Sequence, residues 1–457
     1  MGVTALLAAF AGGYGYHRDE LYFVAAGHHL AWAYADQGPL TPLIARAMTT
    51  LAPDSLTVLR LPSAVMAGAT VLLTGLLASE LGANRRAQII ASSCAAAASV
   101  VLVVGHLLST TTFDLLAWAA LCWLLARIIN GGDERLWVAA GVVAGLALLN
   151  KPLLAFLAAA LCAGLLLAGP RHVLRSPWLW AGVAVATALW SPWLLWQGAH
   201  GWPQLDVSSA IASGGSGSSQ PRWALVPFQF LLVSPVLAPV WIAGLVALAA
   251  DRTLRPYRVF AIAWGLLVLT FLATGGKPYY LAGLFPVLLA AGSIPTERWL
   301  CAGSRWRQRW LAAAIALSAM VSTVIALPVL PASESGPVVA VNGDIGETIG
   351  WPELVREVAL AYRATPGHPV IFTANYGEAG AIDRYGRALG LPAAFSGHNA
   401  FAWWGPPPAN AAPVITVGLH ARALQLFAGC RLVTRIENSA GIDNDERGEP
   451  IERCLRP

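Results

Sequence analysis

The chain has 457 residues, of which 57% are hydrophobic and only 12% are charged. A soluble globular protein carries about 25% charged residues, so this composition and a mean hydropathy of +0.60 exclude an ordinary soluble domain and indicate a protein that crosses a membrane several times. The net charge of +5 comes from arginines spread over short loops, which argues against nucleic acid as a partner and leaves membrane lipids as the expected surroundings.

Apolar runs along the chain predict about eleven membrane-spanning helices. The first run, residues 1–13, is shorter than the ~20 residues that a span needs. It is followed by runs at roughly 57–81, 87–107, 113–130, 136–150, 152–169, 177–196, 223–250, 258–274, 280–296 and 310–330. We therefore expect a polytopic α-helical membrane protein whose transmembrane domain covers residues 1–330.

The segment between the first two runs, residues 14–56, is expected to lie flat on the membrane. It holds two short apolar-faced stretches, broken at Gly38-Pro39, that are too short and too polar to span and that suit interfacial helices.

Arginines in alternate loops predict the orientation. They are Arg85, Arg86, Arg127, Arg135, Arg171, Arg175, Arg252, Arg255, Arg258, Arg298, Arg305, Arg307 and Arg309. Loops rich in arginine face the cytoplasm, so the opposite loops, with "YHRDELYF", "STTTFD", "LNKP", "WQGAHGWPQLD" and "GGKPYY", are expected outside.

Residues 331–457 are more polar and predict a small extracytoplasmic α/β domain. "DIGETIGWPELVREVALAYR" has the period of an amphipathic helix, and "HPVIFTANY", "APVITVG" and "RLVTRIEN" favour strands. Cys430 and Cys454 both fall in this domain, where an oxidising compartment permits a disulfide. Two free thiols are the alternative.

Lone carboxylates mark the outer mouth of the expected helix bundle. Asp19 and Glu20 follow the first apolar run, and Asp114 lies where one span ends and the next begins. A carboxylate at a membrane boundary is costly unless it is solvated, paired or functional, and one of them could act as a general base. A helix N-cap is the alternative for Asp114, with Thr110 to Thr112 as rivals.

Lys151 and Lys277 are the only lysines of the chain, and both fall at outer helix ends. A lysine suits a phosphate, although a lysine that reaches up to the membrane interface is the alternative. Four aromatic residues fit an interfacial belt, the stacking of a sugar or the lining of a lipid groove: Tyr279, Tyr280, Trp196 and Trp202.

Several of these stretches resemble one family of membrane enzymes. "YHRDELYF", "LAWAYADQGPLTPLIARA", "STTTFDLLAWA", "LNKPLLAFL", "LLWQGAHGWP" and "GGKPYYLAGLFPVLLAAG" are similar to the family that groups bacterial aminoarabinose transferases with protein O-mannosyltransferases, a glycosyltransferase family 39-like group of the GT-C class. "NYGEAGAIDRYG", "SGHNAFAWWGPP" and "GIDNDERGEPI" resemble its bacterial branch. The Asp-Glu pair is the most specific motif.

The resemblance implies an inverting transfer from a polyprenyl-phosphate sugar on the outer membrane face to an envelope glycan, lipid or protein. It implies that Asp19 is the catalytic base, with Glu20 and Asp114 as the other acidic residues of the catalytic set. It matches Lys151 and Lys277 to basic positions near the donor phosphate, where Arg60 is a further candidate, and Asp36 to an acidic position of the family. Asp36 and the aromatic residues Tyr279, Tyr280, Trp196 and Trp202 are the candidates for substrate binding. Asp36 precedes Gly38-Pro39, where relatives carry a Pro-Pro pair, so the local turn departs from the pattern.

Other readings stay open from the sequence. The sequence fixes no cofactor, but a divalent cation, Mg²⁺ or Mn²⁺, could be held by Asp19, Asp36 and Asp114. A transporter or flippase for a polyisoprenoid-linked or free sugar is the rival function, although such proteins often show internal repeats and charges at the membrane midplane. An inactive sensor or scaffold is the third.

Overall fold

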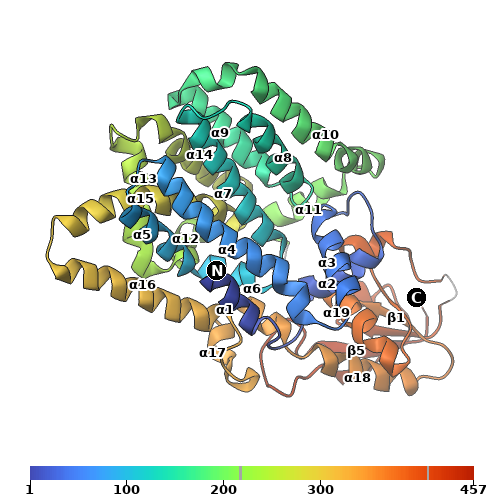
Figure 1. The fold of residues 1–457 in the computed structure, drawn as a ribbon. Helices are drawn as coiled ribbons and strands as arrows, with labels where there is room; N and C mark the ends of the chain where they lie inside the picture. The colour runs from blue at the N-terminus through green and yellow to red at the C-terminus, as the bar shows by residue number, and fades with distance from the viewer. Residues whose placement is uncertain (216–218, 409–410, 457) are drawn as a thin grey trace. The chain divides into compact units, whose positions relative to one another are not determined.

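The computed structural model describes residues 1–215, 219–408 and 411–456, and its chain divides into two compact units (Figure 1). Unit 1 comprises Met1–Ala8, Gln37–Leu40 and Pro62–Thr323, and unit 2 comprises Ala9–Asp36, Thr41–Leu61 and Val324–Pro457. Unit 2 therefore joins the C-terminal region to two segments from the start of the chain. The predicted domain boundary at residue 330 stays a prediction.

Unit 1 is helical. Its helices, of which the first, second and last have an end in unit 2, are α1 (Gly2–Phe10), α4 (Leu56–Glu80), α5 (Arg85–Ala96), α6 (Ser99–His106), α7 (Thr110–Ile129), α8 (Leu136–Leu148), α9 (Leu154–Ala168), α10 (Pro177–Ala199), α11 (Pro203–Ala212), α12 (Leu225–Val233), α13 (Ala238–Ala250), α14 (Arg258–Thr274), α15 (Phe285–Cys301) and α16 (Arg305–Ala326). A 3₁₀ turn, η5 (Pro278–Leu284), leads into α15.

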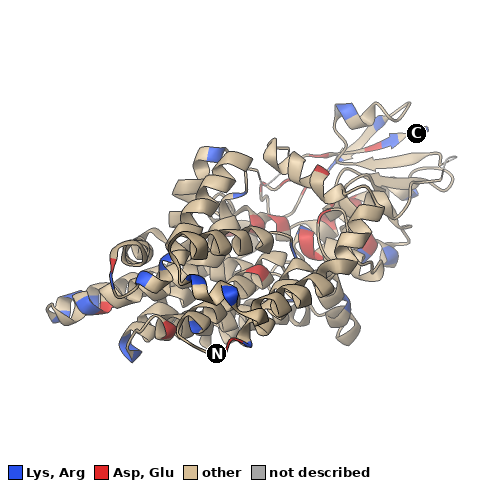
Figure 2. Cartoon of the chain, turned by 90° about the horizontal axis from the view of Figure 1, so that it is seen from above, with Lys and Arg blue, Asp and Glu red and all other residues tan. Residues whose placement is uncertain are grey.

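Many of these helices suit a membrane. Among the described residues, 6 helices are long and apolar enough to cross one, or up to 8 if the bent pairs α5–α6 and α12–α13 each count as one span. The shorter helices α8 and α9 are also apolar, and Figure 2 shows that most of the helical ribbon carries no charged residue. The chain is a multi-pass membrane protein, and the number of eleven spans stays a prediction.

Glycines let the helices of unit 1 approach closely. A Cβ on Gly244 of α13 would lie 1.9 Å from the carbonyl oxygen of Leu288 in α15, and one on Gly292 would lie 1.9 Å from that of Val240. Small residues at such crossings are how helices pack tightly in lipid, where no hydrophobic force drives them together. The Ala- and Gly-rich composition of these runs therefore explains why their helices pack closely.

Unit 2 contains a mixed sheet covered by helices (Figure 1). Its helices are α2 (Arg18–His28), α3 (Leu40–Leu51), α17 (Gly336–Val339), α18 (Trp351–Arg363), α19 (Tyr376–Ala381) and α20 (Ala421–Leu424). Its strands are β1 (Val370–Thr373), β2 (Ala394–Ser396), β3 (Val414–Val417), β4 (Arg431–Arg435) and β5 (Pro450–Cys454). In the described residues they form one sheet in the order β2-β1-β3-β5-β4, parallel from β2 to β3 and antiparallel beyond.

The predicted elements of the C-terminal region fall where their patterns indicate. β1, β3 and β4 lie in the three predicted strands, and α18 lies in the predicted amphipathic helix. Helix α18 buries Trp351, Leu354 and Val358 on one face, which packs against β3 and β5. The strands β2 and β5 were not predicted.

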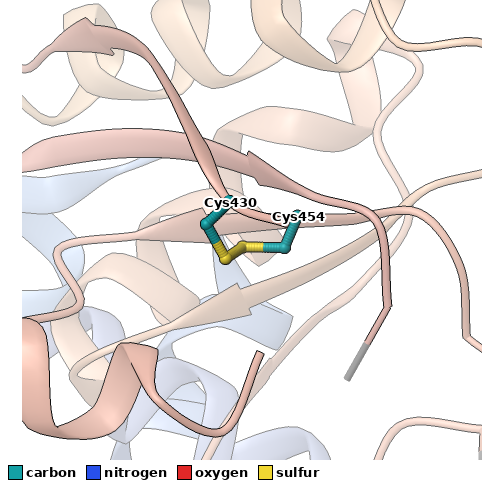
Figure 3. Close-up of a disulfide and its surroundings, with 2 residues drawn as sticks. All are labelled: Cys430 and Cys454. Atoms are coloured by element: carbon teal, nitrogen blue, oxygen red, sulfur yellow. A yellow bond between two sulfur atoms is a disulfide. The ribbon is translucent and has the colours of Figure 1, made fainter. Parts of the chain in front are cut away.

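Cys430 and Cys454 form a disulfide in unit 2 (Figure 3). The bond joins the residue before β4 to the last residue of β5, which is β4's antiparallel neighbour. It therefore ties the edge strand of the sheet to the strand beside it.

Loss of this bond should weaken unit 2. The sequence separation of 24 residues means that Cys430→Ser frees a loop in the unfolded state, which costs about 3 kcal/mol of stability. Thermal unfolding of the purified protein measures the effect, with Cys162→Ser, an exposed free thiol, as the control. Equal melting temperatures for the two variants would contradict the expectation.

Candidate functional site

The stretch "YHRDELYF" is the start of a helix. His17 is the N-cap of α2: its Nδ1 accepts a hydrogen bond from the Asp19 backbone N–H at 3.1 Å, and its own N–H donates to the Glu20 carboxylate at 2.8 Å. This is a capping box, which satisfies two backbone groups that the helix leaves unpaired. Asp19 and Glu20 thus lie in the first turn, where the helix dipole favours negative charge.

Glu20 points into the protein and pairs with Arg60. The Arg60 Nε and Nη2 each donate to one Glu20 oxygen at 2.8 Å, and both side chains are buried. The same guanidinium donates to the main-chain carbonyls of Ala11 at 3.0 Å and Gly15 at 2.8 Å. The structure therefore engages Arg60, predicted as a phosphate ligand, with a carboxylate and the loop that precedes α2.

Asp19 is half-buried and meets a tyrosine from the C-terminal region. The Tyr376 hydroxyl donates to Asp19 Oδ1 at 2.7 Å. The Tyr376 ring lies 4.8 Å from that of Tyr22, whose hydroxyl donates to Asp36 Oδ1 at 2.6 Å. Asp19 and Asp36 are thus joined through a tyrosine pair.

Asp36 is half-buried, and burial raises its pKa to about 6. Its second oxygen accepts from the Asn399 side-chain amide at 3.2 Å. Residues 36 and 399 are far apart in sequence, so no local pattern predicts this contact.

Arg18 connects α2 to the C-terminal region. Its Nη1 lies 3.2 Å from Glu347 and 2.6 Å from Asp445, and its Nε donates to the Tyr376 hydroxyl at 3.4 Å. Sequence reasoning assigned no role to Arg18 or Tyr376. The signal for Tyr376 was the motif "NYGEAGAIDRYG", which contains it.

Unit 1 holds a second group of candidate residues around Asp114. Ser109, not Asp114, caps α7 with its side chain, so the capping alternative for Asp114 does not hold. The Asn150 amide donates to Asp114 Oδ1 at 3.2 Å and to the Thr110 carbonyl at 2.8 Å. The buried Asp114 Oδ2 has no hydrogen-bond partner among the described residues.

A small cavity opens beside Asp114. It is lined by Thr111, Asp114, Leu115, Trp118, Lys151, Leu153, Tyr279, Tyr280, Ala282 and Gly283. The Lys151 Nζ lies 4.9 Å from the centre of the Tyr280 ring and 5.4 Å from that of Tyr279. A cation on aromatic faces is stabilised by the ring quadrupoles, so the structure brings together four of the predicted residues of unit 1.

Three further candidates of unit 1 are not among the described residues that line the cavity: Lys277, Trp196 and Trp202. Lys277 precedes η5, while the Trp196 ring stacks on His200 at 4.0 Å at the end of α10. Trp202 is the N-cap of α11.

The three carboxylates named as metal candidates do not form one cluster within either unit as far as the structure describes them. Among the described residues, no group of three or more His, Cys, Asp and Glu side chains could hold a metal ion. Asp19 and Asp36 belong to unit 2, whereas Asp114 belongs to unit 1. The divalent cation stays a prediction.

Comparison with known proteins finds membrane glycosyltransferases. Residues 36–196 match the family model of dolichyl-phosphate-mannose-protein mannosyltransferases. The crystal structure of ArnT from Cupriavidus metallidurans bound to undecaprenyl phosphate is similar to the chain at a TM-score of 0.64 and 14% identity, covering 99% of this chain and 96% of that one. The apo structure of the same protein matches at a TM-score of 0.64 and 15% identity, and the match covers 98% of this chain and 96% of that one.

A third structure, an oligosaccharyltransferase from Archaeoglobus fulgidus tethered with an acceptor peptide, has a TM-score of 0.47 and 13% identity over 86% of this chain and 63% of that one. No curated protein sequence matches the chain. The fold is that of the GT-C membrane glycosyltransferases, which confirms the resemblance seen in the sequence.

The buried pair of Glu20 and Arg60 should matter for stability. Arg60→Ala leaves a buried carboxylate without its cation and should cost about 3–5 kcal/mol. The matched control is Asp54→Ala, which breaks an exposed pair with Arg384 and should cost about 0–1 kcal/mol. Thermal unfolding of both variants checks this. Equal losses of unfolding free energy in Arg60→Ala and Asp54→Ala would contradict the expectation that the buried ion pair contributes more to stability than the exposed one.

Proposed function

We propose that this protein is an inverting glycosyltransferase that moves a sugar from a polyprenyl-phosphate donor to an acceptor on the outer face of the cytoplasmic membrane. The observation that carries the proposal is the cavity of unit 1, where Lys151 lies over two tyrosines and the buried Asp114 lines the same space. Likeness of the fold to a protein crystallised with undecaprenyl phosphate supports a donor of this class. The acceptor would be an envelope glycan, lipid or protein.

Lys151 would bind the donor phosphate. Negative charge develops on the phosphate as the sugar leaves, and a fixed cation in a water-poor pocket stabilises that charge more than it stabilises the ground state. The rings of Tyr279 and Tyr280 hold the ammonium group at the cavity. The Asn150 amide donates to Asp114 Oδ1 and so holds this carboxyl group beside the same cavity.

Asp19 would act as the general base in a single displacement. The bond between the anomeric carbon and the phosphate oxygen breaks, and polyprenyl phosphate leaves with the electron pair. The acceptor oxygen bonds the opposite face of that carbon, which inverts its configuration, and the acceptor proton passes to the Asp19 carboxylate. Asp19 suits this role because the first turn of α2 holds it in place.

Glu20 and Arg60 take a supporting part in this proposal. Their buried ion pair holds the loop before α2 and turns Glu20 away from the base position. This assignment replaces phosphate binding for Arg60 and catalysis for Glu20.

Turnover with the conservative variant Asp19→Asn tests the base. Purified protein supplied with polyprenyl-phosphate sugars and envelope acceptors should release polyprenyl phosphate about 10²- to 10⁴-fold more slowly, which is the usual contribution of a general base. The control is Asp206→Asn, an exposed carboxylate of α11. Equal release by wild type and Asp19→Asn would remove the catalytic assignment, and transport of the lipid-linked sugar without release would favour a flippase.

Donor affinity tests the lysines separately. Lys151→Ala should weaken binding of undecaprenyl phosphate about 10- to 100-fold, because it removes a charged partner of the phosphate. Lys277→Ala in the same assay tests the second lysine. An unchanged affinity in either variant would assign that lysine to anchoring at the membrane interface.

A further inference from the structure

We propose that Tyr376, from the C-terminal region, is a positioning residue that orients the Asp19 carboxylate. The inference rests on the proposed function, in which Asp19 is the base. The two residues are separated by 357 positions, yet the Tyr376 hydroxyl donates to Asp19 Oδ1 at 2.7 Å. Both belong to unit 2, so the contact lies within one compact body.

Tyr376 is held in place by the start of its own helix. Asn375 caps α19: its side-chain oxygen accepts from the Gly377 and Glu378 N–H groups at 2.8 Å and 3.0 Å. The Glu378 carboxylate in turn accepts from the Asn375 N–H at 3.1 Å, which completes a capping box. Two helix starts with the same kind of cap, those of α2 and α19, therefore present Asp19 and Tyr376.

Glycines bring the two helices together. A Cβ on Gly380 would lie 3.0 Å from the backbone of Leu21 in α2, and one on Gly377 would lie 3.0 Å from the Arg18 Cβ. Larger side chains at these positions would push α19 away from α2. The motif "NYGEAGAIDRYG" thus contains the helix cap Asn375, Tyr376 and the two glycines that let α19 lie close to α2.

The hydroxyl of Tyr376 is suited to donate. Burial and the nearby Asp19 carboxylate raise the pKa of Tyr376 well above its ordinary value, so the phenol keeps its proton. Arg18 lies over the ring at 5.5 Å and donates to the same oxygen at 3.4 Å. Glu347 and Asp445 hold Arg18 in place by ion pairs. Arg18 in turn holds the Tyr376 hydroxyl oxygen that donates to Asp19.

A donor on one carboxylate oxygen has two effects on a base. It fixes the rotation of the carboxylate, and productive geometry depends on such supporting contacts. It also favours the ionised form, which accepts the proton.

The titratable and charged groups that face Asp19 come from several segments. They are His17 and Arg18 on α2, Tyr376 on α19, Asp36 after α2 and His398 after β2. Burial lowers the pKa of His398, which favours its neutral form.

Tyr376→Phe isolates the hydroxyl. The variant keeps the ring and its contacts with Tyr22 at 4.8 Å and His398 at 4.9 Å. The matched control is Tyr385→Phe, which removes a hydroxyl from the segment that follows α19. Turnover of a polyprenyl-phosphate sugar is measured for both, with kcat, donor KM, the pH–rate profile and the melting temperature.

We expect Tyr376→Phe to lower kcat about 10- to 100-fold, as for loss of a hydrogen bond to a charged group. Donor KM should stay unchanged, and the acid limb of the pH–rate profile should move to higher pH because the ionised base has lost a donor. Tyr385→Phe should leave kcat and the profile as in wild type. A purely structural role would instead change the melting temperature without moving the acid limb.

The outcomes separate the two proposals. If wild type turns over, Asp19→Asn does not, and Tyr376→Phe matches wild type in kcat and acid limb, the inference on Tyr376 fails while the proposed function stands. If Asp19→Asn is as active as wild type, or wild type releases no polyprenyl phosphate, both fail.

Discussion

The buried ion pair of Glu20 with Arg60 is the contact on which the proposed catalytic end of unit 2 depends. Arg60 satisfies both oxygens of Glu20 and the carbonyls of Ala11 and Gly15, so one guanidinium fixes the turn between α1 and α2. A pair of this kind costs desolvation and persists because every charged atom finds a partner. With the turn fixed, the capping box of α2 places Asp19 where Tyr376 reaches it.

In unit 1 a neutral side chain, the amide of Asn150, holds the Asp114 carboxyl group. Asn150 uses one amide to hold both Asp114 and the carbonyl of Thr110, which ties the start of α7 to the end of α8. Gly38 allows residues 37–40 to dock there, because a Cβ would lie 1.8 Å from the carbonyl oxygen of Leu149. A glycine at position 38 therefore has a packing reason.

Local patterns predicted the helical runs, three strands and the polar stretches at helix ends, because hydrophobic period and charge are local properties. They could not predict β2, which has only three residues, or β5, which begins with a proline. Arg60 was a candidate for the donor phosphate, and no local pattern could show that it pairs with Glu20, which is 40 residues away. Tyr376 was missed as a neighbour of Asp19 since only the fold brings residues 357 positions apart together.

Unit 2 holds the proposed base between α2 and α19, and unit 1 holds the proposed phosphate-binding lysine over two tyrosines. The central proposal is that a lipid phosphate occupies the cavity of unit 1. Cryo-electron microscopy of the purified protein with undecaprenyl phosphate tests this most directly. The account predicts phosphate density within contact distance of the Lys151 Nζ, beside Tyr279 and Tyr280; a phosphate bound elsewhere, with that cavity left without lipid, would contradict it.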